Sequence, residues 1–297
     1  MQRPEKAQER LRPFFDPRGV IRRIERAGSH FLTQKLYPWL PGFWIPYSWI
    51  LRRQLTLSST TVTLPGLPES FDGLRVLMVS DIHAGPFVSR RTLFGAIERL
   101  MTVEPDLIVL PGDMVSARHE EIELHREAFA LLRAPLGCYA VLGNHDHYTR
   151  NVPRVIDGLG QLGIEVLMNR SIHLERNGER LCLAGVDDML MGEPDLEAAL
   201  SQATSPTVLL SHNPDMLFDA SRRDVELVLS GHTHAGQVRL PGLPVLVPQS
   251  RYRLDEGRYR HRATELIVSR GIGAVGVPLR TFCPPEAIVL TLKRSRA

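Results

Sequence analysis

Cysteine is scarce in this chain of 297 residues, which contains only Cys138, Cys182 and Cys283. The three lie far apart, and none belongs to a Cys-x-x-Cys pair, the spacing typical of zinc and redox sites. An odd number of distant cysteines argues against a disulfide framework, which a chain of this length does not need in order to form a core. We therefore expect reduced, mostly buried thiols, as in a cytosolic protein.

Long apolar runs are also missing. No stretch of about 18 uninterrupted apolar residues occurs, which argues against a transmembrane helix. Met1 is followed by a polar, charged stretch, whereas a signal peptide has a short basic region and then an apolar run. We therefore expect a cytoplasmic protein, and any contact with a membrane to be peripheral.

The net charge is small, +3, but it is unevenly distributed. Residues 1–60 carry eleven Lys or Arg against four Asp or Glu, whereas the remainder carries 25 against 29. A basic arm on a mildly acidic body indicates an anionic partner for the arm, either a membrane surface or nucleic acid. We divide the chain into an N-terminal arm, residues 1–59, and a globular domain, residues 60–297.

Aromatic residues are few overall, but the uncharged run 36–51 of the arm contains all the tryptophans: Trp39, Trp44 and Trp49. Three prolines in this run prevent a continuous helix. The preceding residues, 19–36, have helical periodicity, with basic side chains off the apolar stripe. A broken aromatic segment beside a basic helix suits a membrane–water interface. The alternative is that these aromatic side chains pack on the rest of the protein or on a partner.

From about Thr60 onward, short apolar runs rich in Val, Ile and Leu alternate with helical stretches. Five runs have the character of buried strands: 74–80, 106–110, 139–142, 207–211 and 225–230. Helices are predicted near 90–101 and 120–132, and further strands at 265–269 and 287–292. The alternation predicts an α/β domain.

Each of the five buried strands ends in polar residues that can bind metal. The ends read Ser80-Asp81-Ile82-His83, Pro111-Gly112-Asp113, Gly143-Asn144-His145-Asp146, Ser211-His212-Asn213 and Gly231-His232-Thr233-His234. In open α/β sheets, sites form beyond the carboxyl ends of the strands. We therefore expect these side chains to gather in one pocket.

Taken singly, each of these residues is more often a turn residue, a helix cap or a hydrogen-bonded histidine. The coincidence at five successive strand ends is what favours a metal site. Carboxylate, amide and imidazole donors together suit Mn, Fe or Zn better than Mg or Ca. Seven or eight donors are too many for one ion, so we expect two metal ions that share a carboxylate.

The order Asp-x-His, Gly-Asp, Gly-Asn-His-Asp, His, Gly-His-x-His resembles that of the calcineurin-like metallophosphoesterases, over about residues 74–292. The surrounding sequences, such as 210–215 and 231–237, look like a bacterial branch that includes membrane-associated phosphodiesterases and a UDP-2,3-diacylglucosamine pyrophosphatase. The resemblance implies a four-layer α/β/β/α sandwich of two mixed sheets.

The resemblance also implies roles for the strand-end residues. The first metal would be held by Asp81, His83 and His234, the second by Asn144, His212 and His232, with Asp113 as the bridge. A hydroxide bound to the two ions would attack the phosphorus atom. His145 would stabilise the transition state and protonate the leaving oxygen, and Asp146 would orient His145.

Four further residues lie near these motifs. Ser116 stands where many similar proteins have Asp or Asn, at a position usually behind the ligands. His147 either contacts substrate or is a solvent-exposed residue. Arg270 and Arg280, in a Gly/Pro-rich segment, either clamp a phosphate or form ordinary ion pairs.

The leading hypothesis is a dinuclear-metal phosphoesterase that cuts a phosphodiester or pyrophosphate bond of a lipid-linked or nucleotide-sugar-lipid substrate. UDP-2,3-diacylglucosamine is the candidate substrate, and the inner face of the cell membrane is the expected location. A second hypothesis is a soluble phosphodiesterase acting on nucleotides or nucleic acid, which the basic arm allows but the uncharged aromatic run disfavours. A third, a non-catalytic scaffold with the same fold, is disfavoured because every ligand position is filled.

Overall fold

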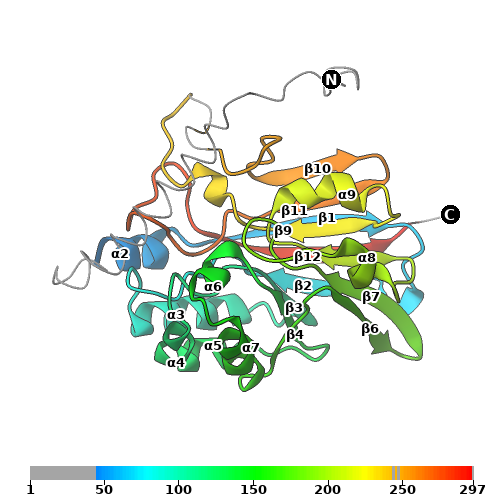
Figure 1. Cartoon of the computed structure of the whole chain (residues 1–297), viewed down its shortest axis with the longest axis horizontal. Coiled ribbons are helices and arrows are strands. Elements are labelled where there is room, and N and C mark those ends of the chain that lie inside the picture. The colour runs from blue at the N-terminus through cyan, green and yellow to red at the C-terminus, as the bar shows by residue number, and fades with distance from the viewer. Residues whose placement is uncertain (1–44, 243–244, 246–247, 296–297) are drawn as a thin grey trace.

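The computed structural model describes residues 45–242, 245 and 248–295, and it contains two six-stranded sheets packed face to face (Figure 1). The first sheet has the order β1 (Thr56–Leu64), β12 (Glu286–Arg294), β2 (Arg75–Met78), β3 (Leu107–Pro111), β4 (Cys138–Val141) and β5 (Ile164–Val166). The second has the order β10 (Gly257–His261), β11 (Thr264–Val268), β9 (Leu227–Ser230), β8 (Thr207–Leu210), β7 (Glu179–Gly185) and β6 (Arg170–Arg176).

Three buried clusters separate four layers. The first lies between the first sheet and the helices α2 (Ile45–Gln54), α3 (Arg90–Met101), α4 (Glu120–Leu124), α5 (Arg126–Phe129) and α7 (Val152–Gly160). The second lies between the two sheets. The third lies between the second sheet and the helices α8 (Leu196–Leu200) and α9 (Leu217–Ala220). The predicted α/β/β/α sandwich is confirmed.

Both sheets are mixed, as predicted. In the first sheet, β2, β3, β4 and β5 are parallel to one another, whereas β12 is antiparallel to β2 and parallel to β1. In the second, β7, β8, β9 and β11 are parallel, and β6 and β10 add antiparallel edges. The parallel strands are buried on both faces, which explains why they read as continuous apolar runs in the sequence.

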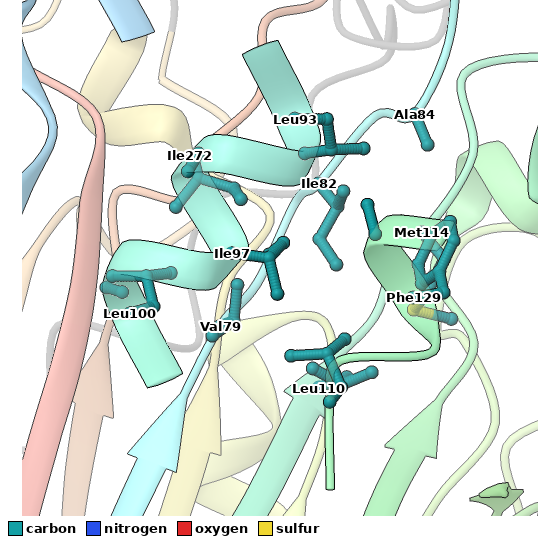
Figure 2. Close-up of a cluster of buried hydrophobic side chains, with 14 of the residues drawn as sticks. Val79, Ile82, Ala84, Leu93, Ile97, Leu100, Leu110, Met114, Phe129 and Ile272 are labelled. Atoms are coloured by element: carbon teal, nitrogen blue, oxygen red, sulfur yellow. The ribbon is translucent and has the colours of Figure 1, made fainter. Parts of the chain in front are cut away.

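The loops that leave β2 and β3 are anchored in the first cluster (Figure 2). Ile82 points into it beside α3, whose Leu93 and Ile97 are almost fully buried, and Met114 lies beside Phe129 of α5. These apolar residues lie next in sequence to Asp81, His83 and Asp113. Burying one side chain therefore directs its polar neighbours to the opposite side of the loop.

Part of the predicted arm belongs to the folded domain. In α2, Tyr47 and Leu51 are 1% exposed and lie in the first cluster, and β1 begins at Thr56, which pairs with Glu286. The boundary at residues 59 and 60 falls inside β1, and the folded domain includes the described residues from Ile45 onward. Pro46 lies in the first turn of α2, where proline does not break a helix. The predictions for residues 1–44, including the helix over 19–36 and the positions of Trp39 and Trp44, lie outside the described residues.

Seven predicted strands are present as β2, β3, β4, β8, β9, β11 and β12, and the helix over 90–101 is α3. The helix expected over 120–132 is divided at His125 into α4 and α5. Cys138, Cys182 and Cys283 are buried free thiols, as expected. Among the described residues, no helix has the length and apolar character needed to cross a membrane.

Candidate metal centre

The first sheet supplies the carboxylates of the centre. Asp81 and His83 follow β2, Asp113 follows β3, and Asn144, His145 and Asp146 begin the short helix α6 (Asn144–Tyr148) after β4. The second sheet supplies imidazoles from two strand ends: His212 follows β8, and His232 and His234 follow β9. The structure thus brings all nine predicted site residues to one edge of the two sheets, and all nine are buried.

The backbone at this edge is held in an uncommon conformation. Five of the predicted ligands have positive φ, between 45° and 73°: Asp81, His83, Asp113, His232 and His234. A left-handed conformation costs a non-glycine residue on the order of 1 kcal/mol. Such strain at five ligand positions is typical of a functional site and is maintained by the packed sheets around it.

One group of donor atoms converges around His83. Its Nε2 lies 3.1 Å from Nε2 of His234 and 3.5 Å from Oδ2 of Asp113. Oδ1 of Asp81 lies 3.4 Å from Nε2 of His234. These atoms can surround a single cation, because one atom from each of Asp81, His83 and His234 lies within 4.8 Å of the others.

A second group of donors converges around His212. Its Nε2 lies 3.2 Å from Oδ2 of Asp113 and 3.2 Å from Nδ1 of His232. Oδ1 of Asn144 is buried and accepts no hydrogen bond from the part of the chain that the structure describes. The same Asp113 oxygen therefore faces both groups, as a bridging ligand would.

Charge is concentrated in this buried space. Burial raises the pKa of Asp81 to about 6, although the neighbouring His212 opposes the rise. Burial and the neighbouring His145 lower the pKa of His83 to about 3. Burial opposes ionisation of both Asp113 and His212, yet their mutual attraction holds the pKa of Asp113 well below its usual range and raises that of His212 to about 10. At neutral pH the metal-free His212 imidazole therefore carries a second proton, and a metal ion would take the place of that proton.

The imidazoles of His212 and His234 differ in the partner of Nδ1, the ring nitrogen that faces away from the centre. Nδ1 of His212 donates to the carbonyl of Pro111 at 2.8 Å, so Nε2 is the nitrogen that faces the centre and that a metal ion would bind in place of a proton. Nδ1 of His234 lies 2.9 Å from Nη2 of Arg280, a 3% exposed arginine. Burial and the Arg280 cation both lower the pKa of His234 well below its usual value, so this imidazole stays neutral.

The interactions of His145 and Asp146 differ from those implied by the family resemblance. Nδ1 of His145 lies 2.6 Å from the carbonyl of Ser116, so this carbonyl orients the ring instead of Asp146. The Asp146 carboxylate accepts backbone N–H groups of Asp113, Val115 and Gly143 at 2.9, 3.1 and 2.9 Å. Asp146 therefore ties the loop after β3 to the start of α6. Its predicted role in orienting His145 stays a prediction, and any such effect would pass through this loop, because the side-chain partner of His145 is the Ser116 carbonyl.

Two glycines allow the two sheets to approach each other at the centre. A Cβ atom on Gly112, after β3, would lie 2.3 Å from Nδ1 of His212 in the other sheet. A Cβ atom on Gly231, after β9, would lie 2.3 Å from Oδ2 of Asp81. Each sheet therefore has a glycine where a ligand of the other sheet needs room.

Three residues outside the predicted ligand set, His147, Arg270 and Arg280, each contact a neighbouring side chain. His147 is not solvent-exposed filler, because its Nε2 lies 2.8 Å from Oδ1 of Asp187 and its side chain is only 12% exposed. Arg270 forms the ordinary ion pair, 3.0 Å from Glu286. Arg280 is engaged with His234.

Sequence reasoning missed the loop after β7. Asp187 and Asp188 are buried there, and Oδ1 of Asp188 accepts no hydrogen bond from a described residue. His147 and Asp187 help to line a groove of about 1060 Å³, together with methionines and further carboxylates. The run Gly185-Val186-Asp187-Asp188, directly after an apolar segment, carried the same strand-end signal as the motifs that were recognised.

The donors fit a pair of metal ions. They form two groups that share one carboxylate, the Asn144 oxygen lacks a partner among the described residues, and histidine nitrogens face each other at hydrogen-bond distance. Mixed nitrogen and oxygen donors suit borderline divalent ions.

Comparisons with known proteins agree with this geometry. Residues 74–236 match the model of the family described as calcineurin-like phosphoesterase. The chain is 34% identical over 236 residues to the uncharacterized metallophosphoesterase YkuE of Bacillus subtilis, with 76% of this chain and 82% of that protein covered. It is 35% identical over 247 residues to a zebrafish transmembrane protein with metallophosphoesterase domain, with 77% of this chain but only 55% of that protein covered.

Among solved structures, the Thermus thermophilus sulfate thiohydrolase SoxB aligns with a TM-score of 0.44 at 15% identity, over 76% of this chain and 57% of that one. The family match covers every motif residue from Asp81 to His234, the same residues that the two sheets bring together. The chain therefore belongs to the calcineurin-like phosphoesterases, and it is a metal-dependent phosphoester hydrolase.

Proposed function

We propose that the protein hydrolyses a phosphodiester or pyrophosphate bond of a lipid-linked substrate at a membrane surface, using two metal ions. The observation that supports the reaction type best is the position of Asp113, whose Oδ2 faces His83 of one donor group and His212 of the other. In this proposal Asp81, His83 and His234 hold one ion and Asn144, His212 and His232 hold the other. When bound, two such ions activate water for attack and neutralise charge on the phosphoryl oxygens.

His145 is the proposed proton donor to the leaving oxygen. A carbonyl oxygen only accepts, so the contact with Ser116 requires a proton on Nδ1. The proton given to the leaving oxygen would then be a second one, carried on Nε2 of the imidazolium form. The His145 backbone N–H also donates to Oδ1 of Asp113 at 2.8 Å. His145 is therefore fixed both to the bridging carboxylate and to the loop after β3. Asp146 keeps these two loops together through three backbone N–H groups.

The proposal of a lipid-linked substrate is supported by the arm. Residues 1–44 carry nine Lys or Arg against four Asp or Glu, and α2 ends in the exposed pair Arg52 and Arg53. The groove beside His147 carries carboxylates, which disfavours a polyanionic strand of nucleic acid. UDP-2,3-diacylglucosamine is the specific substrate that we propose to test.

The test uses purified protein stripped of metal with a chelator and then resupplied with Mn, Zn or Fe. We expect hydrolysis of bis(p-nitrophenyl) phosphate to disappear on stripping and to return with metal. UDP-2,3-diacylglucosamine in mixed micelles is then compared with a nucleotide diester at equal concentration. Preference for the nucleotide diester would refute the lipid substrate, and metal-independent hydrolysis would refute the two-metal mechanism.

A further inference from the structure

Two loops beside the metal centre form one unit with an apolar outer surface. The Gln237 side chain donates to the carbonyls of Val275 and Val277 and accepts the N–H of Val275. Backbone hydrogen bonds join residues 237 and 239 to Thr281. Five large apolar side chains of this unit are exposed, and we call them the apolar rim: Val238, Leu240, Val277, Leu279 and Phe282.

The rim is connected directly to the metal centre. Arg280 lies between Leu279 and Phe282 in sequence but points inward, where its guanidinium contacts His234 and donates to the carbonyl of Gly273 at 2.8 Å. Cys283 donates to the carbonyl of His234 at 3.0 Å. The outer surface of the rim and the ligand His234 are therefore on opposite sides of the same short segment.

The rim also adjoins helix α2. The Tyr47 hydroxyl donates to the carbonyl of Gly273 at 2.7 Å. Figure 1 shows α2 beside the loop between β11 and β12, which carries three of the five rim residues. On its outer side, α2 exposes two further large apolar side chains, Ile45 and Trp49. Residues 1–44 join the domain at this point. The apolar surface therefore begins where the basic arm ends.

Phe282 is the most unusual residue of the rim. Its side chain is 69% exposed and its φ is +51°, a conformation that a bulky side chain rarely adopts. Both the strain and the exposed ring are unfavourable in water. A residue such as Asn or Asp would fit this backbone better. An aromatic ring held outward at such a position is expected where it enters an apolar environment.

We infer that the apolar rim and the exposed face of α2 contact the surface of an anionic lipid bilayer. Aromatic and aliphatic side chains enter the headgroup region, while basic residues bind anionic headgroups. Arg52 and Arg53, on the last turn of α2, are exposed beside the apolar face, and the adjoining sequence 1–44 is basic. This combination matches the charge of an anionic bilayer and disfavours a neutral apolar partner protein.

A contact between the rim and a bilayer would give a lipid substrate a short route to the metal centre. This consequence rests on the proposed function. A rim seated in the headgroup region would place His234 and its partners close to the level of lipid phosphates. Binding to lipid itself does not depend on catalysis, so the two proposals can fail separately.

The experiment measures binding of the full chain to vesicles of phosphatidylcholine containing about 30% phosphatidylglycerol. The test variant is the double substitution Leu279→Asp and Phe282→Asp. The control is Leu124→Asp on α4, because Leu124 is 40% exposed, close to the 43% of Leu279, but lies outside the rim. We expect the double variant to bind at least about tenfold more weakly, since two apolar anchors are lost and two repelled charges are gained. We expect Leu124→Asp to bind like the wild type.

Hydrolysis of bis(p-nitrophenyl) phosphate in solution separates this inference from the proposed function. We expect the double variant to retain wild-type activity there, because neither side chain belongs to the centre. Equal vesicle binding by wild type and double variant would overturn the inference. A lower melting temperature without a change in vesicle binding would also overturn it, because the rim would then be covered by protein. A wild type that binds vesicles but hydrolyses nothing would refute the proposed catalysis and leave the inference standing.

Discussion

The two sheets contribute unlike halves of the metal centre. The first supplies Asp81 and Asp113 together with His83, Asn144 and the proposed proton donor His145. The second supplies three imidazoles. The first half alone would gather repelling carboxylates, and the second alone would gather neutral rings that bind cations weakly. Only the packed sandwich places an Asp113 oxygen 3.2 Å from Nε2 of His212. The energy of the apolar layer between the sheets therefore assembles the centre.

The glycines show how closely the halves must meet. Gly112 in the first sheet makes room for His212 of the second, and Gly231 in the second makes room for Asp81 of the first. The relation is reciprocal although the two sequences are unrelated. It shows that the distance between the sheets at this edge is set by backbone contact with ligands.

Asp113→Asn tests the carboxylate that faces both donor groups. Of the predicted substitutions, it should reduce activity the most. The amide keeps the shape of the side chain but lacks the negative charge that holds two cations together. We expect loss of at least one metal ion and a fall in kcat of about 10³-fold or more. Metal analysis by mass spectrometry and hydrolysis of bis(p-nitrophenyl) phosphate measure the two effects. Asp157→Asn, on the exposed side of α7, is the control. Full metal content in Asp113→Asn would mean that the two donor groups hold their ions without a shared carboxylate.

His145→Ala tests whether the first sheet contributes a proton donor besides ligands. The backbone N–H that donates to Asp113 is retained in this variant, so the ligands should keep their positions. We expect kcat to fall by about 10²–10⁴-fold with both metals bound. A substrate whose leaving group needs no proton should lose much less. One oxygen of Asp113 and a nitrogen each of His83 and His145 lie within 4.8 Å of one another, so loss of metal would instead identify His145 as a ligand.

Gly231→Ala tests the close contact between the halves without removing any ligand. The added methyl group would overlap Oδ2 of Asp81, 2.3 Å away, and displace this carboxylate. A displacement of about 1 Å in such a site reduces activity by about 10²-fold. Gly95→Ala in α3 is the matched control, because a Cβ atom there meets nothing within 4 Å. That change should leave activity intact and stabilise the helix by about 0.5–1 kcal/mol. Equal activity of the two variants would show that the sheets can move apart at this edge.

Which residues each sheet contributes to the metal centre could largely be predicted from the order of residues in the sequence. Apolar runs followed directly by Asp, His or Asn identified the strand ends, and the geometry of parallel strands placed these ends at one edge. That reasoning succeeds because the buried strands β3, β8 and β9 are short and uniformly apolar, so their ends are sharply marked.

Contacts between residues far apart in sequence could not be predicted in the same way. Pairing of Thr56 with Glu286 makes β1 part of the first sheet, yet Thr56–Leu64 is mostly Ser and Thr and lacks the continuous apolar run that marked the buried strands. The partner of His147 lies 40 residues away, at Asp187. Ser116 orients His145 through a backbone carbonyl, which no side-chain pattern reports. Positive φ at the five ligand positions is only weakly marked by residue type, because Asp and His adopt it more often than most non-glycine residues but still uncommonly.

Glu121→Gln tests a buried carboxylate of the first half that lies outside the donor groups. Of the predicted changes, it should have the smallest effect. Glu121, in α4 of the first half, is a buried carboxylate outside the donor groups, and its Oε2 accepts the N–H groups of Ser116, Ala117 and Arg118 at 2.7, 3.1 and 3.4 Å. Burial raises its pKa from 4.5 to about 7. Between these two pH values the folded state binds more protons than the unfolded state, so stability falls as the pH rises.

The shift corresponds to about 3 kcal/mol in favour of the folded state at low pH, lost by about pH 7. The glutamine side chain cannot titrate, so the variant should lose less stability than the wild type between about pH 4.5 and about pH 7.5. Urea unfolding of the metal-free proteins at these two pH values measures the difference. Because metal ligands titrate equally in both proteins, their contributions cancel in the comparison. An identical pH dependence in wild type and variant would show that the three backbone donors keep Glu121 ionised despite its burial, and that the loop after β3 is anchored by charge.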